Sequence, residues 1–242
     1  MAMGRGGRNA AAVARIVWDT ADKYLRNVVE PQEYGDYILP FTVLRRLECL
    51  LDETKPEVIK YVGIVGHLPA HLIDIAVKDK FGLSFYNVSP LDLATIASVD
   101  DNVDKSLLNY VAGFSQNIAD IWTAFEFPKL VAKLANASRL HSVVKHFSTL
   151  PLGSTSVEDA VMGDIFEDVM YRAFDKKGKA AGAFYTPRDA IKLMVDVLGY
   201  SRFGAQGGDW GASVTTTLAQ NHGDVVAAFH LADSGYEVLS KY

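Results

Sequence analysis

The sequence predicts a mainly α protein, in which a helical bundle N-terminal domain is followed by a short C-terminal β-turn-α fragment. Two observations predict this. Apolar side chains recur at helical spacing along most of the chain up to Leu198. Five glycines then crowd residues 199–211, and a short helical pattern follows over residues 212–220. That order is typical of a strand, a tight turn and a helix.

Composition limits the class of protein. The 242 residues, 49% hydrophobic and 22% charged, suffice for one or two domains with a real core. The net charge of -5 argues against a surface that binds nucleic acid over its whole extent, so any such contact must be local. The single cysteine, Cys49, lies among leucines and predicts a buried thiol in a reducing compartment. Residues 1–11 read as a flexible tail without a signal peptide or membrane span, which predicts a cytoplasmic location.

Two amphipathic helices are predicted first. Apolar side chains at helical spacing indicate one helix over residues 9–28, with Asn9 as its cap. A second follows over residues 34–51, and Pro40 should kink it. We expect the solvent face of this second helix to carry three charged residues, Arg45, Arg46 and Glu48.

The helical pattern of apolar residues is less regular in the middle of the chain. Glycines interrupt the pattern over residues 52–80 before a helical pattern resumes at residues 71–80. Residues 83–90 read as an extended connection, with Ser89 capping a helix whose first residue is Pro90. Apolar stripes over residues 118–125 and 140–147 indicate two further small helices of a bundle.

Two capping patterns mark helices nearer the C-terminus. Thr155 with Glu158 forms a capping box before a helix over residues 157–174. Thr186 followed by Pro187 marks another helix start, at residue 187. Together with the glycine-rich composition after Leu198, these boundaries divide the chain into residues 1–11, 12–150, 151–198 and 199–242.

Several segments over about residues 12–198 resemble the N-terminal region of the modification subunit of type I restriction-modification systems. They follow the family's order and approximate spacing. The segments are Ile16-Val17-Trp18-Asp19-Thr20-Ala21-Asp22-Lys23, Tyr34-Gly35-Asp36-Tyr37-Ile38-Leu39-Pro40, Leu44-Arg45-Arg46-Leu47-Glu48, Phe85-Tyr86-Asn87-Val88-Ser89, Tyr110-Val111-Ala112-Gly113-Phe114-Ser115, Met162-Gly163-Asp164-Ile165-Phe166-Glu167 and Phe184-Tyr185-Thr186-Pro187-Arg188. The resemblance implies a helical domain before an adenine-N6 DNA methyltransferase domain. It also implies S-adenosylmethionine as methyl donor, and DNA and a specificity subunit as partners.

The same resemblance implies a cofactor contact at the helix start near residue 187. In the family this segment lies against the methionine part of the methyl donor. Physically, free N–H groups and the positive end of the helix macrodipole suit a ligand carboxylate, although an ordinary capped helix explains the pattern equally well. The implied contact residues are Gly182, Ala183, Phe184, Tyr185, Thr186 and Pro187.

The sequence departs from the family after Leu198. The family's acidic-Pro-x-x-Gly-x-Gly cofactor loop and Asn-Pro-Pro-aromatic motif are not found in these 242 residues. We therefore expect no methyl transfer from these residues alone. The hypotheses that remain are a binding or assembly module and a non-functional fusion.

Residues 198–231 resemble instead the nucleophile elbow of epoxide hydrolases of the α/β-hydrolase fold. Small residues around Asp209 favour a strained strand-to-helix turn, and its carboxylate would attack an epoxide carbon. The oxyanion segment, cap tyrosines and downstream acid and base are not found, and His222 and His230 do not occupy the base's place. A third interpretation takes the strand, turn and helix as a replacement for the lost cofactor loop.

Overall fold

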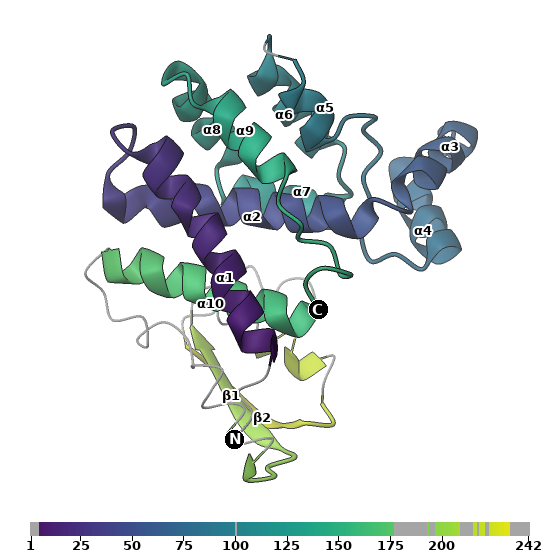
Figure 1. Cartoon of the computed structure of the whole chain (residues 1–242). Coiled ribbons are helices and arrows are strands. Elements are labelled where there is room, and N and C mark those ends of the chain that lie inside the picture. The colour runs from purple at the N-terminus through teal and green to yellow at the C-terminus, as the bar shows by residue number, and fades with distance from the viewer. Residues whose placement is uncertain are drawn as a thin grey trace. The chain divides into compact units, whose positions relative to one another are not determined.

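The computed structural model describes residues 5–99, 101–176, 193, 197–208, 215–216, 218–220 and 223–232. The chain forms two compact units, Met1–Ala183 and Phe184–Tyr242. The described part of the first is helical, and the second contains a two-stranded parallel sheet (Figure 1). The predicted fold class is confirmed. In the described part, no helix is long and apolar enough to cross a membrane.

The first helix differs from its prediction at both ends. α1 spans Arg5–Thr20 and continues as a π-helix, η1, over Ala21–Leu25. Asn9 therefore lies inside the helix, so the prediction that it is the cap is wrong. Residues 5–11, assigned to a tail from the sequence, belong to α1.

The helix α2, Tyr34–Leu51, is the centre of the first unit, and Pro40 lies inside it as expected. A 3-10 turn, η2, over Pro31–Glu33 leads into it. Figure 1 shows α1 crossing α2. Eleven residues of α2 are buried, because its side chains pack against several other helices. Leu44 and Phe41 are fully buried and belong to the main hydrophobic core.

Short helices, α3 to α9, follow between α2 and the last long helix of the described residues. The first two, α3 and α4, form a hairpin in a stretch where the sequence indicated only the second. Asp92, rather than Ser89, caps α5, because its side chain accepts the Thr95 backbone N–H at 2.6 Å. The predicted helix start at Pro90 is therefore wrong. The bounds are Lys55–Val65 for α3, Ala70–Phe81 for α4, Leu93–Ala97 for α5, Val103–Ala112 for α6, Gln116–Ala124 for α7, Phe127–Asn136 for α8 and Leu140–Ser148 for α9.

The helix predicted over residues 157–174 is present as α10, Asp159–Lys176. Thr155 lies in a turn, so the helix begins later than the proposed capping box requires. Its side chains Met162, Ile165 and Val169 join the main core. Because α10 packs against both α1 and α2, it is an integral part of the helical unit.

In the second unit, β1 spans Phe203–Gly208 and β2 spans Val226–Ala232. The strands are parallel, with Gly204 opposite Ala228 and Gly208 opposite Ala232. Helical residues at 215–216 and 218–220 lie between them in the sequence. A crossover of this kind is what parallel strands require. The strand and the helical residues after it agree with the sequence prediction, whereas β2 was not predicted.

Candidate functional site

The residues predicted to contact a methyl donor, 182–187, lie outside the described residues, as does Asp209 of the hydrolase alternative. Their roles stay predictions. The described residues instead show what the family-like segments do in the first unit. Those segments meet one another in a set of buried polar contacts centred on α2.

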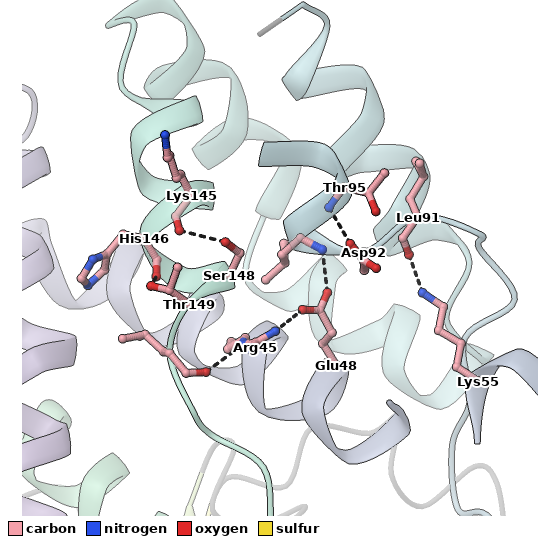
Figure 2. A network of polar contacts seen from close by, with 12 residues as sticks. Arg45, Glu48, Lys55, Leu91, Asp92, Thr95, Lys145, His146, Ser148 and Thr149 are labelled. Atoms are coloured by element: carbon pink, nitrogen blue, oxygen red, sulfur yellow. Dashed lines mark hydrogen bonds and ion pairs between the residues drawn. The ribbon is translucent and has the colours of Figure 1, made fainter. Parts of the chain in front are cut away.

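Glu48 is the first centre of this set. It is 8% exposed, and its carboxylate accepts the Leu93 backbone N–H at 2.8 Å and a hydrogen bond from the Arg45 guanidinium. Figure 2 shows Glu48 and Arg45 pointing toward each other from α2. The Tyr110 hydroxyl on α6 also bonds to Glu48. Burial, with the charge of Glu48 adding to it, raises the pKa of Tyr110. Glu48 thus joins α2 to α5 and α6.

Lys55, at the start of α3, packs beside this group. Its amine lies 4.7 Å from the ring centroid of Tyr110. The same amine donates to the Leu91 carbonyl oxygen (Figure 2). Burial lowers the pKa of Lys55, while the charges of Glu48 and Asp92 oppose this shift. A cation over an aromatic face and near carboxylates is stabilised electrostatically. This contact fixes the start of the α3–α4 hairpin.

Arg46 is the second centre. Its side chain is buried, and it donates to the carbonyl oxygens of Leu152 and Val157, the latter at 2.9 Å, and to the carboxylate of Asp159. These acceptors lie in the connection between α9 and α10 and at the first residue of α10. The neighbouring Arg45 donates to the Leu150 carbonyl oxygen at 2.8 Å. Two consecutive arginines of α2 therefore hold the connection that leads into α10.

Two further family-like segments pair directly. Residues 87 and 114 form an antiparallel bridge, and the Val88 N–H donates to the Gly113 carbonyl oxygen at 2.8 Å. Asn87 is 1% exposed and donates from its side chain to the Tyr110 carbonyl oxygen at 3.1 Å. A Cβ at Gly113 would lie 2.9 Å from the Ser89 backbone nitrogen. Only glycine fits this close approach without displacing the backbone of the other segment.

The buried arginine and glutamate contradict the sequence prediction for α2. Arg46 and Glu48 are 5% and 8% exposed, so their assignment to a solvent face is wrong, and Arg45 is only partly exposed. One signal was present: apolar residues surround the three charges on all sides of the helix, including Val43, Leu47 and Leu50, and a helix that is apolar all round is a buried one. Cys49 is half-buried rather than fully buried, and burial raises its pKa.

Comparison with known proteins supports the family resemblance carried by the segments that contact one another here. The HsdM N-terminal domain family matches residues 13–147, and the N-6 DNA Methylase family matches residues 157–209. The hydrolase interpretation finds no support in these matches, and the second one extends past Leu198 into the glycine-rich stretch. No solved structure matches the chain.

One curated relative is the type I restriction enzyme MjaIX methylase subunit of Methanocaldococcus jannaschii. It is 23% identical over 203 residues, which cover 75% of this chain and 34% of the relative. The chain therefore spans about a third of the length of this relative. With more than half of its residues matched by one family model, the chain belongs to the HsdM N-terminal domain family and continues into a partial N-6 DNA Methylase region.

Proposed function

We propose that this chain is the assembly part of a type I modification subunit, in which the helical unit sets the position of the methylase region. The observation that carries this proposal is the triple anchorage of Arg46. Its guanidinium on α2 binds Leu152, Val157 and Asp159, which lie where one family match ends and the next begins. Because charge-assisted hydrogen bonds are directional, this arrangement fixes the start of α10 against α2.

The partners follow from the family. The proposed partners are DNA and a specificity subunit, and the proposed location is the cytoplasm, consistent with the single cysteine. The net charge of -5 favours contacts with DNA through a limited basic area or through the specificity subunit.

The proposed cofactor is S-adenosylmethionine, held by residues 182–187 after α10. The strands of the second unit also bear on this proposal. β1 and β2 are parallel, and ligands of α/β sheets bind outside the carboxyl ends of such strands. The residues after β1 lack the family's acidic-Pro-x-x-Gly-x-Gly loop and place the bulky Trp210 there instead. We therefore expect weak binding of the methyl donor.

Isothermal titration tests the proposal. The full chain is titrated with S-adenosylmethionine, alone and after mixing with a specificity subunit, and complex formation is followed by light scattering. Replacement of Tyr185 or Thr186 by alanine should abolish the heat of donor binding. Tyr200→Ala is the matched control, because Tyr200 is exposed and lies outside the proposed site. A chain that binds neither the donor nor the specificity subunit would refute the proposed function.

A further inference from the structure

The helical hairpin α3–α4 is a small packing unit beside the main core. Val58 on α3 and Val77 on α4 are fully buried, and with Tyr86 they form a cluster that is separate from the main core. In Figure 1 the hairpin lies beside the end of α2 and extends away from the other helices of the first unit. Its attachment to that unit therefore depends on few side chains.

The hairpin has far fewer buried residues than the helix that precedes it. Residues 55–82, all of which the structure describes, include two buried residues, the valines just named. The 18 residues of α2 include eleven. Large apolar side chains of the hairpin face solvent instead, since Ile64 is 71% exposed and Ile75 is 54% exposed. Apolar burial is the dominant favourable contribution to folding, so the hairpin is held less firmly than α2.

The segment that follows the hairpin is bonded to the main part of the helical unit. The Tyr86 carbonyl oxygen accepts the Ser115 backbone N–H at 2.9 Å, and the Tyr86 N–H donates to the Ser115 hydroxyl at 3.2 Å. The Asn87 side chain donates to the Tyr110 carbonyl oxygen at 3.1 Å. These bonds hold Tyr86 to α6 and to the residue before α7, and none of them involves the hairpin.

Two contacts close the hairpin onto this bonded segment and its neighbours. The first is apolar: the two buried valines share one cluster with Tyr86. The second is polar: the Lys55 amine, at the first residue of α3, donates to the Leu91 carbonyl oxygen and lies 4.7 Å from the ring centroid of Tyr110. Both contacts join the hairpin to residues that have other partners in the unit.

We propose that the α3–α4 hairpin opens as one unit while the main core stays folded. Opening separates the two buried valines from Tyr86 and releases Lys55, and it leaves the bonds between Tyr86 and Ser115 intact. Segments that bury little apolar surface are the ones that open locally in folded proteins. A change of shape is thereby confined to residues 55–82, and Arg46 still holds the start of α10.

Once detached from Tyr86, the hairpin would not keep its helices. α3 has 11 residues and α4 has 12, and isolated helices of this length are marginal in water. Gly63, within α3, lowers the helix propensity further. Opening of the hairpin and loss of the hydrogen bonds in both helices are therefore one event, which hydrogen exchange measures.

Native-state hydrogen exchange of the full chain tests this inference. The amides of α3 and α4 should have similar protection factors, at least about tenfold lower than those of α2 and α9. Val77→Ala should speed exchange in both α3 and α4 by the same factor, roughly tenfold or more, because the side chain loses its packing when the hairpin opens. Lys55→Met should speed both helices by a smaller factor, roughly fivefold, because it removes one hydrogen bond.

Val144→Ala is the matched control, because Val144 on α9 is fully buried in the main core. Its packing is the same whether the hairpin is closed or open. The change should therefore speed exchange in α2 and α9, whose amides exchange through unfolding of the whole unit, and leave the rates in α3 and α4 unchanged. Circular dichroism checks that each variant retains its helices.

Three results would overturn the inference. The first is a wild type in which the hairpin amides are as protected as those of α2. The second is equal acceleration of the hairpin and α2 by Val144→Ala, because the hairpin would then open only together with the core. The third is an acceleration by Val77→Ala or Lys55→Met that is confined to one helix of the hairpin, because the two helices would then not open as one unit.

Discussion

Arg46 on α2 donates a hydrogen bond to the backbone carbonyl oxygen of Val157 at 2.9 Å, across 111 positions of the sequence. The same guanidinium binds Leu152 and Asp159. A buried arginine with three acceptors is a cross-link between an early helix and the connection that precedes α10. It explains how a helix matched by the methylase family becomes part of the N-terminal helical core.

Replacement of Arg46 by alanine should lower the free energy of unfolding by about 3–5 kcal/mol. The change leaves two buried carbonyl oxygens without their donor, at roughly 1–3 kcal/mol each, whereas the carboxylate of Asp159 is exposed and adds little. Urea denaturation followed by circular dichroism measures it. Arg26→Ala is the control, because its ion pair with Asp22 is exposed and should be worth less than about 1 kcal/mol. Equal effects of the two changes would contradict the role given to Arg46.

Ile165→Ala should destabilise the helical unit by roughly 2–5 kcal/mol. Ile165 on α10 is fully buried in the main core, and the loss of its side chain leaves a cavity between packed helices. Tyr171→Ala, on the same helix, removes a side chain that is 55% exposed and should cost much less. Thermal unfolding of both variants checks whether α10 unfolds together with the rest of the unit. A separate, earlier transition for α10 would contradict its assignment to this core.

His146 should make stability fall on acidification. Burial between α9 and the N-terminal helix lowers the pKa of His146 below its usual value, while a hydrogen bond to the backbone of Ile16 opposes the shift. Its Nε2 is buried and has no hydrogen-bond partner among the described residues. The unfolded chain therefore binds a proton near pH 6.5 while the folded chain does not, so the free energy of unfolding decreases as the pH falls through about 6.5 toward the lower folded value.

Urea denaturation between pH 5 and 8 measures this effect, and His146→Gln should show a shallower dependence on pH than the wild type. His67→Gln is the control, because His67 is an exposed histidine. If the two variants have the same pH dependence, the burial of His146 does not contribute to acid sensitivity. Nuclear magnetic resonance titration of the imidazole signals identifies the histidines responsible for the remaining dependence of stability on pH.

Apolar periodicity was sufficient to locate several of the helices. The stripe over residues 140–147 corresponds to α9, and the pattern over residues 34–51 corresponds to α2. It failed for side chains whose partners are distant in the sequence. Arg46 was predicted to face solvent because its acceptors lie more than a hundred residues away, and no local pattern encodes such a contact.

Local capping chemistry was a weaker guide to boundaries. Ser89 before Pro90 and Asp92 before Leu93 are both acceptable helix starts, and the structure uses the second. The buried carboxylate of Glu48 binds the Leu93 N–H, which favours a start at Leu93. The pairing of β1 with β2 was likewise beyond local patterns, because parallel strands are brought together by a crossover. The proposed donor contacts at residues 182–187 stay predictions.

Two glycines should respond to alanine with opposite signs. At Gly113 the new Cβ would lie 2.8 Å from the Ser89 Cβ and 2.9 Å from the Ser89 backbone nitrogen. Overpacking of this kind costs about 1–3 kcal/mol. At Gly63, in α3, nothing lies within 4 Å of the added Cβ. Alanine there should stabilise the helix by roughly 0.5–1 kcal/mol, because it restricts the unfolded chain.

Urea denaturation of the two variants gives the comparison, and each serves as the control for the other because the chemical change is identical. Gly113→Ala should also increase hydrogen exchange at the Val88 N–H, which donates to the Gly113 carbonyl oxygen. Equal stabilities for the two variants would mean that the segments at residues 85–89 and 110–115 tolerate separation. The close approach at Gly113 would then not be what holds these family-like segments together.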